Sequence, residues 1–246
     1  MSLPVHLVTS LADVVVGDDV EVTGDEAHHA VAVRRVRAGE RLQLTDGAGT
    51  LVEGAVRATG KRQLTLTVDD LRRVPRTEPE LVVVQALPKG DRGELAVEVL
   101  TEVGVARIVP WAAERSVAVW KGERAVKSLA RWRSTAREAT KQARRSWLAE
   151  VDELALTGDV LELIEGADLA VVLHEAETAA LADVEVPVAG RLVVVVGPEG
   201  GLTDEEVGAF AEAGAVPVRL GAEVLRTSTA GVAACAALLS RTPRWR

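Results

Sequence analysis

The chain has 246 residues, of which 48% are hydrophobic and 27% are charged, and its formal net charge is −8. This length and composition are typical of a folded protein with one large domain or two modest ones. A single cysteine, Cys235, excludes an internal disulfide and favours a reducing compartment. We recognise neither a secretory leader nor an apolar run long enough to span a membrane, so we expect a soluble, cytoplasmic protein.

Short alternating segments occupy the first part of the chain. The stretch "LQLTDGAGTLVEGAVRA" (42–58) has two β-like runs around the turn residues 46–49, and "RQLTLTV" (62–68) alternates with a period of two. Strands this closely spaced predict a small barrel or sandwich. The segment 72–80 has two prolines and mixed charge, which makes it the best candidate for a linker.

After this linker, apolar strands alternate with helices. The predicted strands are 81–88, 107–111, 168–175, 191–197 and 216–221. The predicted helices are 91–105, 122–147, 203–213 and 226–240. Nearly continuous apolar strands that alternate with helices predict an α/β domain around a mostly parallel sheet.

The long helix is strongly basic, because residues 121–147 contain nine basic and two acidic side chains. At 100° per residue, one apolar sector holds Val126, Leu129, Trp132, Ala136, Ala139, Ala143 and Trp147. The opposite face holds Lys127, Arg131, Lys141 and Arg145. Two interpretations stay open, a solvated charged face and a face that contacts the phosphates of a nucleic acid.

Several common catalytic and binding motifs are missing. The sequence contains no Walker-type phosphate loop, no G-x-G-x-x-G after a strand and no G-x-S-x-G elbow. The four histidines do not have the spacing of metal ligands, so we expect no metal site.

The stretch "VVVVGPEGG" (193–201) joins an apolar strand to a helix through a glycine-rich bend. Thr203 and Glu206 form a capping-box pattern, and the helix start is acidic, which disfavours an anionic phosphate. A neutral or cationic ligand, such as the sulfonium of S-adenosylmethionine, fits better; the alternative is a simple tight turn. The loops "VLHEAE" (172–177) and "RLGAEVLRTSTAG" (219–231) also follow strands, and we expect all three at one sheet edge.

Five motifs then occur in the order of a known family. They are "ALPKGDR" (86–92), "TEVGVARIVP" (101–110), "RW…EATKQARR" (131–145), "VVGPEGGLTDEEV" and "LGAEVLRTSTA". Over essentially its whole length, the chain resembles the RsmE family of SPOUT-class methyltransferases. These enzymes use S-adenosylmethionine to methylate N3 of a uridine in 16S ribosomal RNA, conventionally position 1498.

The resemblance implies a PUA-like RNA-binding barrel over residues 1–74 and a SPOUT methyltransferase domain over 75–246. The second domain would hold a trefoil knot, an exception to the rule that chains do not thread their own loops. The resemblance also implies a homodimer, S-adenosylmethionine as the cofactor, and ribosomal RNA or the small ribosomal subunit as the partner.

The resemblance also carries over to individual residues. The implied cofactor-binding residues are Leu173, His174, Gly197, Pro198, Glu199, Gly200, Gly201, Leu220, Gly221, Val224, Leu225 and Thr227. The candidates for RNA contact are Arg35, Lys89, Arg92, Lys127, Arg131, Lys141 and Arg145. We expect Arg226, beside the cofactor loop, to stabilise a developing uracilate. Trp111 and Trp120 are weaker candidates for stacking on a base.

One position departs from the family pattern. Where members commonly read "LRTETA", this chain has Ser228 in place of the acidic residue, and no general base is identified. Two other functions therefore stay open. One is a SPOUT methyltransferase that acts on another RNA, and the other is a non-catalytic RNA-binding protein with a decayed knot site.

Overall fold

A computed structural model describes residues 3–245 of the chain, which forms two compact units. The first unit contains the residues up to 76 together with 140–148, and the second contains 77–139 and 149 onward. The sequence places a boundary near residue 74 but does not anticipate that 140–148 belongs to the first unit. Within the described residues, no helix is both long and apolar enough to cross a membrane.

The first unit is built on a five-stranded sheet. Its strands are β1 (Val5–Leu7), β2 (Asp19–Thr23), β3 (Arg41–Thr45), β4 (Thr50–Thr59) and β5 (Gln63–Arg73). Their order is β1-β3-β4-β5-β2, and every pair is antiparallel except β1 with β3. A short helix, α1 (Gly24–His28), continues into a π-helical turn at His29–Val33. This half-barrel confirms the small N-terminal β domain.

The predicted hairpin around residues 46–49 connects β3 and β4. The Asp46 carboxylate closes the turn, because its Oδ1 accepts hydrogen bonds from the backbone N–H groups of Ala48 (2.8 Å) and Thr50 (3.1 Å). Buried and exposed residues alternate along the strands, and the inward positions form the core. That core includes Leu42, Leu44, Val52, Val56, Leu64, Leu66 and Val68.

A buried ionic cluster lies in the first unit. Glu26 Oε1 accepts a hydrogen bond from Lys141 Nζ at 2.8 Å, and Glu26 Oε2 lies 3.6 Å from His6 Nδ1. The side chains of Lys141 and His6 are only 8% and 3% exposed. Burial acts to raise the pKa of Glu26, but the hydrogen bonds and charges of His6 and Lys141 outweigh it and lower the pKa to about 2.

This cluster corrects one sequence prediction, because Lys141 does not lie on a solvated basic face. Val126, assigned to the apolar sector, is 71% exposed. The helix α3 (Gly122–Gln142) ends before Arg145, and Arg144 has a left-handed backbone with φ of 53°. The apolar and basic faces that the sequence predicts over 122–147 therefore end at residue 142.

Trp147 also lies beyond the helix end, inside the first unit. Its indole N–H donates to the Val74 carbonyl at 2.8 Å, and the Arg76 guanidinium lies 4.4 Å from the ring centroid. The ring packs so close to Gly49 that a Cβ there would meet it at 2.5 Å. Trp147 is therefore a packing residue, as predicted, but not one on the apolar face of α3.

The second unit is built on a six-stranded, all-parallel sheet with the order β11-β9-β10-β6-β7-β8. Its strands are β6 (Glu80–Ala86), β7 (Arg107–Trp111), β8 (Glu150–Val151), β9 (Leu169–Leu173), β10 (Arg191–Val196) and β11 (Val216–Val218). Its helices are α2 (Arg92–Val103), most of α3, α4 (Thr157–Glu165), α5 (Asp204–Glu212) and α6 (Thr227–Leu239). Short 3-10 turns occur at Leu181–Asp183 and Pro243–Trp245.

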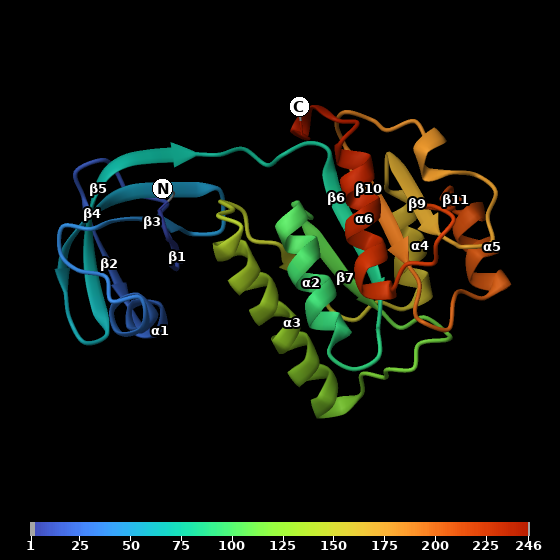
Figure 1. Cartoon of the computed structure of the whole chain (residues 1–246), viewed down its shortest axis with the longest axis horizontal. Coiled ribbons are helices and arrows are strands. Elements are labelled where there is room, and N and C mark those ends of the chain that lie inside the picture. Colours follow the sequence, from blue (N-terminus) through green and yellow to red (C-terminus); the bar gives the residue numbers. More distant parts are fainter. Residues whose placement is uncertain (1–2, 246) are drawn as a thin grey trace. The chain divides into compact units, whose positions relative to one another are not determined.

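Helices cover both faces of this sheet, which confirms the predicted α/β class (Figure 1). On one face, Leu81 and Val83 of β6 pack with residues of α2, α3 and α6, including the buried Cys235. On the other face, Val82 and Val84 pack with α4 and α5. Burial raises the pKa of the Cys235 thiol to about 12, so this cysteine is an inert core residue.

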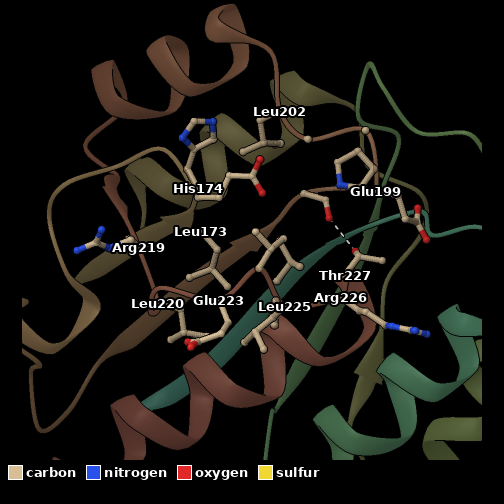
Figure 2. Close-up of a pocket in the computed structure, with 18 of the residues that line it drawn as sticks. Leu173, His174, Glu199, Leu202, Arg219, Leu220, Glu223, Leu225, Arg226 and Thr227 are labelled. Carbon is tan, nitrogen blue, oxygen red and sulfur yellow. Dashed lines mark hydrogen bonds between the residues drawn. The ribbon is translucent and has the colours of Figure 1, made fainter.

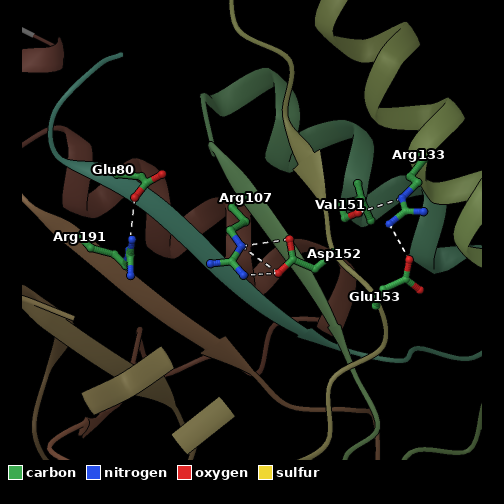
Figure 3. Close-up of polar contacts among 7 residues, drawn as sticks. All are labelled: Glu80, Arg107, Arg133, Val151, Asp152, Glu153 and Arg191. Carbon is green, nitrogen blue, oxygen red and sulfur yellow. Dashed lines mark hydrogen bonds and ion pairs between the residues drawn. The ribbon is translucent and has the colours of Figure 1, made fainter. Parts of the chain in front are cut away.

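Ion pairs stabilise the amino edge of the sheet, where the strands begin (Figure 3). Arg107 donates from Nε to Asp152 Oδ2 at 2.8 Å, and the hydrogen bonds to this carboxylate raise the pKa of Arg107. Arg191 lies 3.2 Å from Glu80. These charges therefore lie at the edge opposite to the loops that follow β9, β10 and β11.

The connection between β9 and β10 lies on the same face as α6. The backbone of Leu181 donates to the Arg219 carbonyl at 2.9 Å, and Arg219 N donates to Ala179 at 2.8 Å. From the end of α6, the Arg241 guanidinium donates to the carbonyls of Leu181 and Val184. The segment after α6 therefore contacts the connection between β9 and β10.

The helix α5 begins with the predicted capping box. Thr203 Oγ1 accepts from the Glu206 N–H at 3.1 Å, and Glu206 Oε2 accepts from the Thr203 N–H at 3.0 Å. The other oxygen, Oε1, accepts from the backbone N–H of Glu114 at 2.8 Å. Glu206 is 5% exposed, so one buried carboxylate holds both the helix start and the segment after β7.

We predict that Glu26→Gln lowers the free energy of unfolding by on the order of 2 kcal/mol at pH 7, because it removes the buried charge that Lys141 needs. The pKa of Glu26 is depressed in the folded state, so its contribution is complete above about pH 4.5 and is lost as the pH falls toward 2. Urea unfolding between pH 7 and pH 3 should show the two proteins converging on acidification. Asp25→Asn, at an exposed neighbour, is the control; an equal effect there would refute the assignment.

We predict that Glu206→Ala destabilises the second unit by about 1–2 kcal/mol, because the backbone N–H groups of Thr203 and Glu114 lose their acceptor. Thermal unfolding is the measurement. Glu205→Ala changes the preceding, exposed carboxylate of the same helix turn and should stay within about 0.5 kcal/mol of the parent. Similar losses in the two variants would mean that helix-end charge, rather than the capping bonds, matters.

Candidate functional site

The carboxyl ends of four parallel strands lie level with one another. Val196 pairs with Gln85 of β6 on one side and with Leu173 of β9 on the other, and Leu173 pairs with Val218 of β11. The loops after β9, β10 and β11 therefore leave the sheet at one edge, as the sequence predicts. Ligands of parallel α/β sheets bind at this edge.

These loops enclose a cavity of about 450 Å³. All twelve residues that the sequence assigns to cofactor binding line it, and so do Arg226 and Arg92. The lining residues that the sequence did not single out are Arg115, Glu175, Val196, Leu202, Arg219, Ala222, Glu223 and Ala230.

Apolar and charged side chains both line the cavity, and Glu223 lies between Leu220 and Leu225 (Figure 2). The side chains of Leu173, Leu220 and Leu225 gather on one side, whereas Glu199 and Arg226 lie on the other. Four arginines and three glutamates line the cavity, so the charges nearly balance. Such a site suits a ligand with both apolar and charged parts better than a bare anion.

Different physical constraints explain why the loop after β10 has glycine at three positions. Gly201 adopts a φ of 73°, in the left-handed region that favours glycine. A Cβ on Gly200 would lie 3.0 Å from the backbone oxygen and the Cβ of Arg115, and one on Gly197 would lie 3.1 Å from Leu202. Close packing, rather than positive φ, thus explains Gly197 and Gly200.

Glu199 connects this loop to the start of α2. Its carboxylate accepts from the backbone N–H of Lys89 at 3.2 Å and lies 3.5 Å from Arg92 Nη1. Together with the buried Glu206, it is therefore already partnered. Asp204 and Glu205, in the first turn of α5, are exposed.

Arg226 is exposed, immediately before α6, and forms no ion pair within residues 3–245. Neither Glu223 nor Glu199, which line the same cavity, forms an ion pair with it. Figure 2 shows its guanidinium directed to the same side of the cavity as Glu199. An unpaired arginine at a cavity can stabilise negative charge on a ligand.

Arg115 is the main lining residue that sequence reasoning missed. Its Nη1 donates to the Leu202 carbonyl at 3.0 Å, and its backbone packs against Gly200. It lies in the segment between β7 and α3, where the sequence has no glycine-rich motif that would point to a ligand. Glu175, Arg219 and Glu223, by contrast, lie inside loops that the sequence already identified.

The other predicted RNA contacts have varied surroundings. Arg35 is exposed, with a φ of 58°. Lys127 lies 3.7 Å from Glu123, and Arg131 lies 3.4 Å from Glu94, so these exposed charges do have acidic neighbours. Such surface pairs are weak and leave both cations accessible to phosphates.

The structure narrows the list of aromatic residues for base stacking. Trp111 is fully buried and packs edge-to-face on Phe210 at 5.4 Å, so its prediction as a stacking residue was wrong. Trp120 packs in the same manner on the buried Trp132 at 5.1 Å. Both rings therefore contribute to the core of the second unit.

Two family models match the chain. The model of an RNA methyltransferase domain matches residues 76–239, and the model of an RNA methyltransferase PUA domain matches residues 22–69. The first match includes every strand of the six-stranded sheet and all three cavity loops.

Curated relatives and solved structures agree with these models. A ribosomal RNA small subunit methyltransferase E of Mycobacterium bovis is 45% identical over 91% of this chain and 87% of its own length. The one of Bacillus subtilis is 30% identical over 90% of each chain. A crystal structure of the enzyme from Neisseria gonorrhoeae, bound to S-adenosyl methionine, has a TM-score of 0.86 at 27% identity and covers 98% of both chains. The chain belongs to the ribosomal RNA small subunit methyltransferase E family.

Proposed function

We propose that this protein transfers the methyl group of S-adenosylmethionine to N3 of a uridine in the 16S ribosomal RNA. The observation that carries the proposal is the single cavity formed by the loops after β9, β10 and β11, which contains all twelve residues expected to bind the cofactor. Family membership supplies the reaction class and the class of RNA.

The cavity fits S-adenosylmethionine in size and chemistry. A volume of about 450 Å³ is in the range of small-molecule sites. The three leucines provide apolar surface for an adenine ring, while the loop backbone provides donors and acceptors for polar groups. Gly197 and Gly200 let this loop pack closely on Leu202 and Arg115.

When bound, S-adenosylmethionine supplies an electrophilic methyl group on a sulfonium. In the transfer, the uracil N3 would give up its proton to solvent water and take the methyl group, and the sulfur would leave with the electron pair of the broken carbon–sulfur bond. The protein must hold N3, carbon and sulfur in line, and this proximity provides much of the rate acceleration. Arg226 stabilises the negative charge that develops on the uracil.

The remaining assignments concern partners. The match to a PUA model supports RNA binding by the first unit, with Arg35 as a contact. Lys89, Arg92, Lys127 and Arg131 supply positive charge in the second unit, and each phosphate contact releases counterions. In this proposal the enzyme is a cytoplasmic homodimer whose substrate is the RNA of the small ribosomal subunit.

One specific observation favours a second function, because Ser228 stands where a family carboxylate is expected. A chain with a decayed site would still bind RNA but would not bind the methyl donor. The complete set of lining residues supports an intact cofactor site instead.

We predict that the purified protein binds S-adenosylmethionine in calorimetry and that a deletion strain lacks one N3-methyluridine in its 16S ribosomal RNA. Mass mapping of that RNA identifies the nucleotide, and restoring the gene should restore the mark. Methylation assays on free ribosomal RNA and on intact small subunits identify the substrate form. If the donor does not bind and the RNA mass is unchanged, the protein is the non-catalytic alternative.

We predict that Arg226→Ala lowers turnover at least about 100-fold, because the developing negative charge loses its cation. The dissociation constant for S-adenosylmethionine should change less than about threefold, since the residue acts on the uracil. Single-turnover methylation and calorimetry measure the two effects. Arg226→Lys keeps the charge and should recover part of the turnover; full activity of Arg226→Ala would exclude a catalytic role.

A further inference from the structure

Gln85 is a buried polar residue at the carboxyl end of β6. It is 0% exposed, follows the apolar run Leu81–Val84, and does not line the cavity. Burial of an amide costs free energy unless hydrogen bonds compensate for the lost water. The bonds that this side chain makes therefore indicate why it occupies a core position.

Gln85 begins a short chain of hydrogen bonds. Its Nε2 donates to the Ala86 carbonyl and to Thr227 Oγ1, both at 3.1 Å. Thr227 Oγ1 in turn donates to the Gly197 carbonyl at 2.7 Å, the bond drawn in Figure 2. The threonine proton is used on Gly197, so the hydroxyl must accept from the amide, and this fixes the amide orientation.

This chain connects two loops of the cavity. Gly197 begins the loop after β10, and Thr227 ends the loop after β11 and opens α6; both line the cavity. Gln85 is level with Val196 in the sheet, so its amide reaches Thr227 from rigid, fully paired backbone. The side chain of Gln85 therefore fixes the positions of the two loops relative to the sheet.

A second feature separates Gln85 from an ordinary core residue. Its Oε1 is buried and has no hydrogen-bond partner within the described part of the chain. An unsatisfied buried acceptor lowers folding stability, and an apolar residue of the same shape would avoid that cost. Residues that break a local folding rule in this way are often found at functional sites.

We propose that Gln85 is a positioning residue for the cofactor cavity, which holds Thr227 and the Gly197 carbonyl in the geometry that binds the donor. The inference rests on the proposed function, because the ligand concerned is S-adenosylmethionine. Gln85 touches neither the donor nor the RNA; it acts through Thr227.

The test is a double-mutant cycle read out by calorimetry with S-adenosylmethionine in the absence of RNA. Gln85→Met keeps the shape and removes the donor, and Thr227→Val removes the hydroxyl from the other end. Each single change should raise the dissociation constant about tenfold, the effect of one hydrogen bond, and the double variant should be little weaker than either. Thr227→Ser keeps the hydroxyl and should bind within about threefold of the parent.

Two controls separate positioning from general stability. Thr229→Val removes a hydroxyl that donates to the Arg226 carbonyl, does not line the cavity, and should leave donor binding unchanged. The melting temperature of Gln85→Met without ligand should equal or exceed that of the parent, whereas a merely structural glutamine would lower it.

The outcomes are distinct. Unchanged donor affinity in Gln85→Met, or effects of the two changes that simply add, would overturn the inference while leaving the proposed function intact. A parent protein that does not bind S-adenosylmethionine would overturn the proposed function itself. If Gln85→Met does not fold, Gln85→Leu, which also removes the amide donor, takes its place in the same cycle with the same two outcomes.

Discussion

Parallel pairing places the carboxyl ends of β6, β9, β10 and β11 level with one another at one edge of the sheet. Gln85, Leu173, Val196 and Val218 share this row, and each fixes where its loop begins. Loops from distant parts of the sequence can then surround one volume without a long, flexible approach. The ion pairs of Arg107 and Arg191 lie at the opposite edge, where they stabilise the sheet without adding charge to the cavity.

Charge at the start of α5 has a different meaning in the structure than in the sequence. Four carboxylates cluster in the sequence, and together they argue against an anionic ligand. In the structure Glu206 caps the helix and binds Glu114 N, while Glu199 binds the start of α2. Glu199 and Glu206 thus stabilise the loop and the helix start. The kind of ligand that the cavity suits is set instead by its leucine side chains and by the near balance of arginines and glutamates.

The fold class and the loop set could be predicted from the sequence because strand periodicity and turn residues are local signals. The β3–β4 hairpin and the α5 cap depend on residues within a few positions of one another. The end of α3 was missed because its basic, amphipathic pattern continues through Arg144, where the backbone turns left-handed. Arg115 was missed, and Lys141 was assigned to the basic face of α3, because their contacts are with Leu202 and Glu26, far away in the chain.

Ser228 links the loop geometry to the chemistry. It lies in the first turn of α6, is 3% exposed, and has no acidic neighbour in that turn. A carboxylate here would be desolvated, and burial would raise its pKa toward that of a useful proton acceptor. Serine has no such basicity at neutral pH, so α6 contributes no base in its first turn. In the proposed mechanism, stabilisation of the deprotonated uracil by Arg226 therefore accounts for more of the barrier reduction than it would beside a carboxylate base.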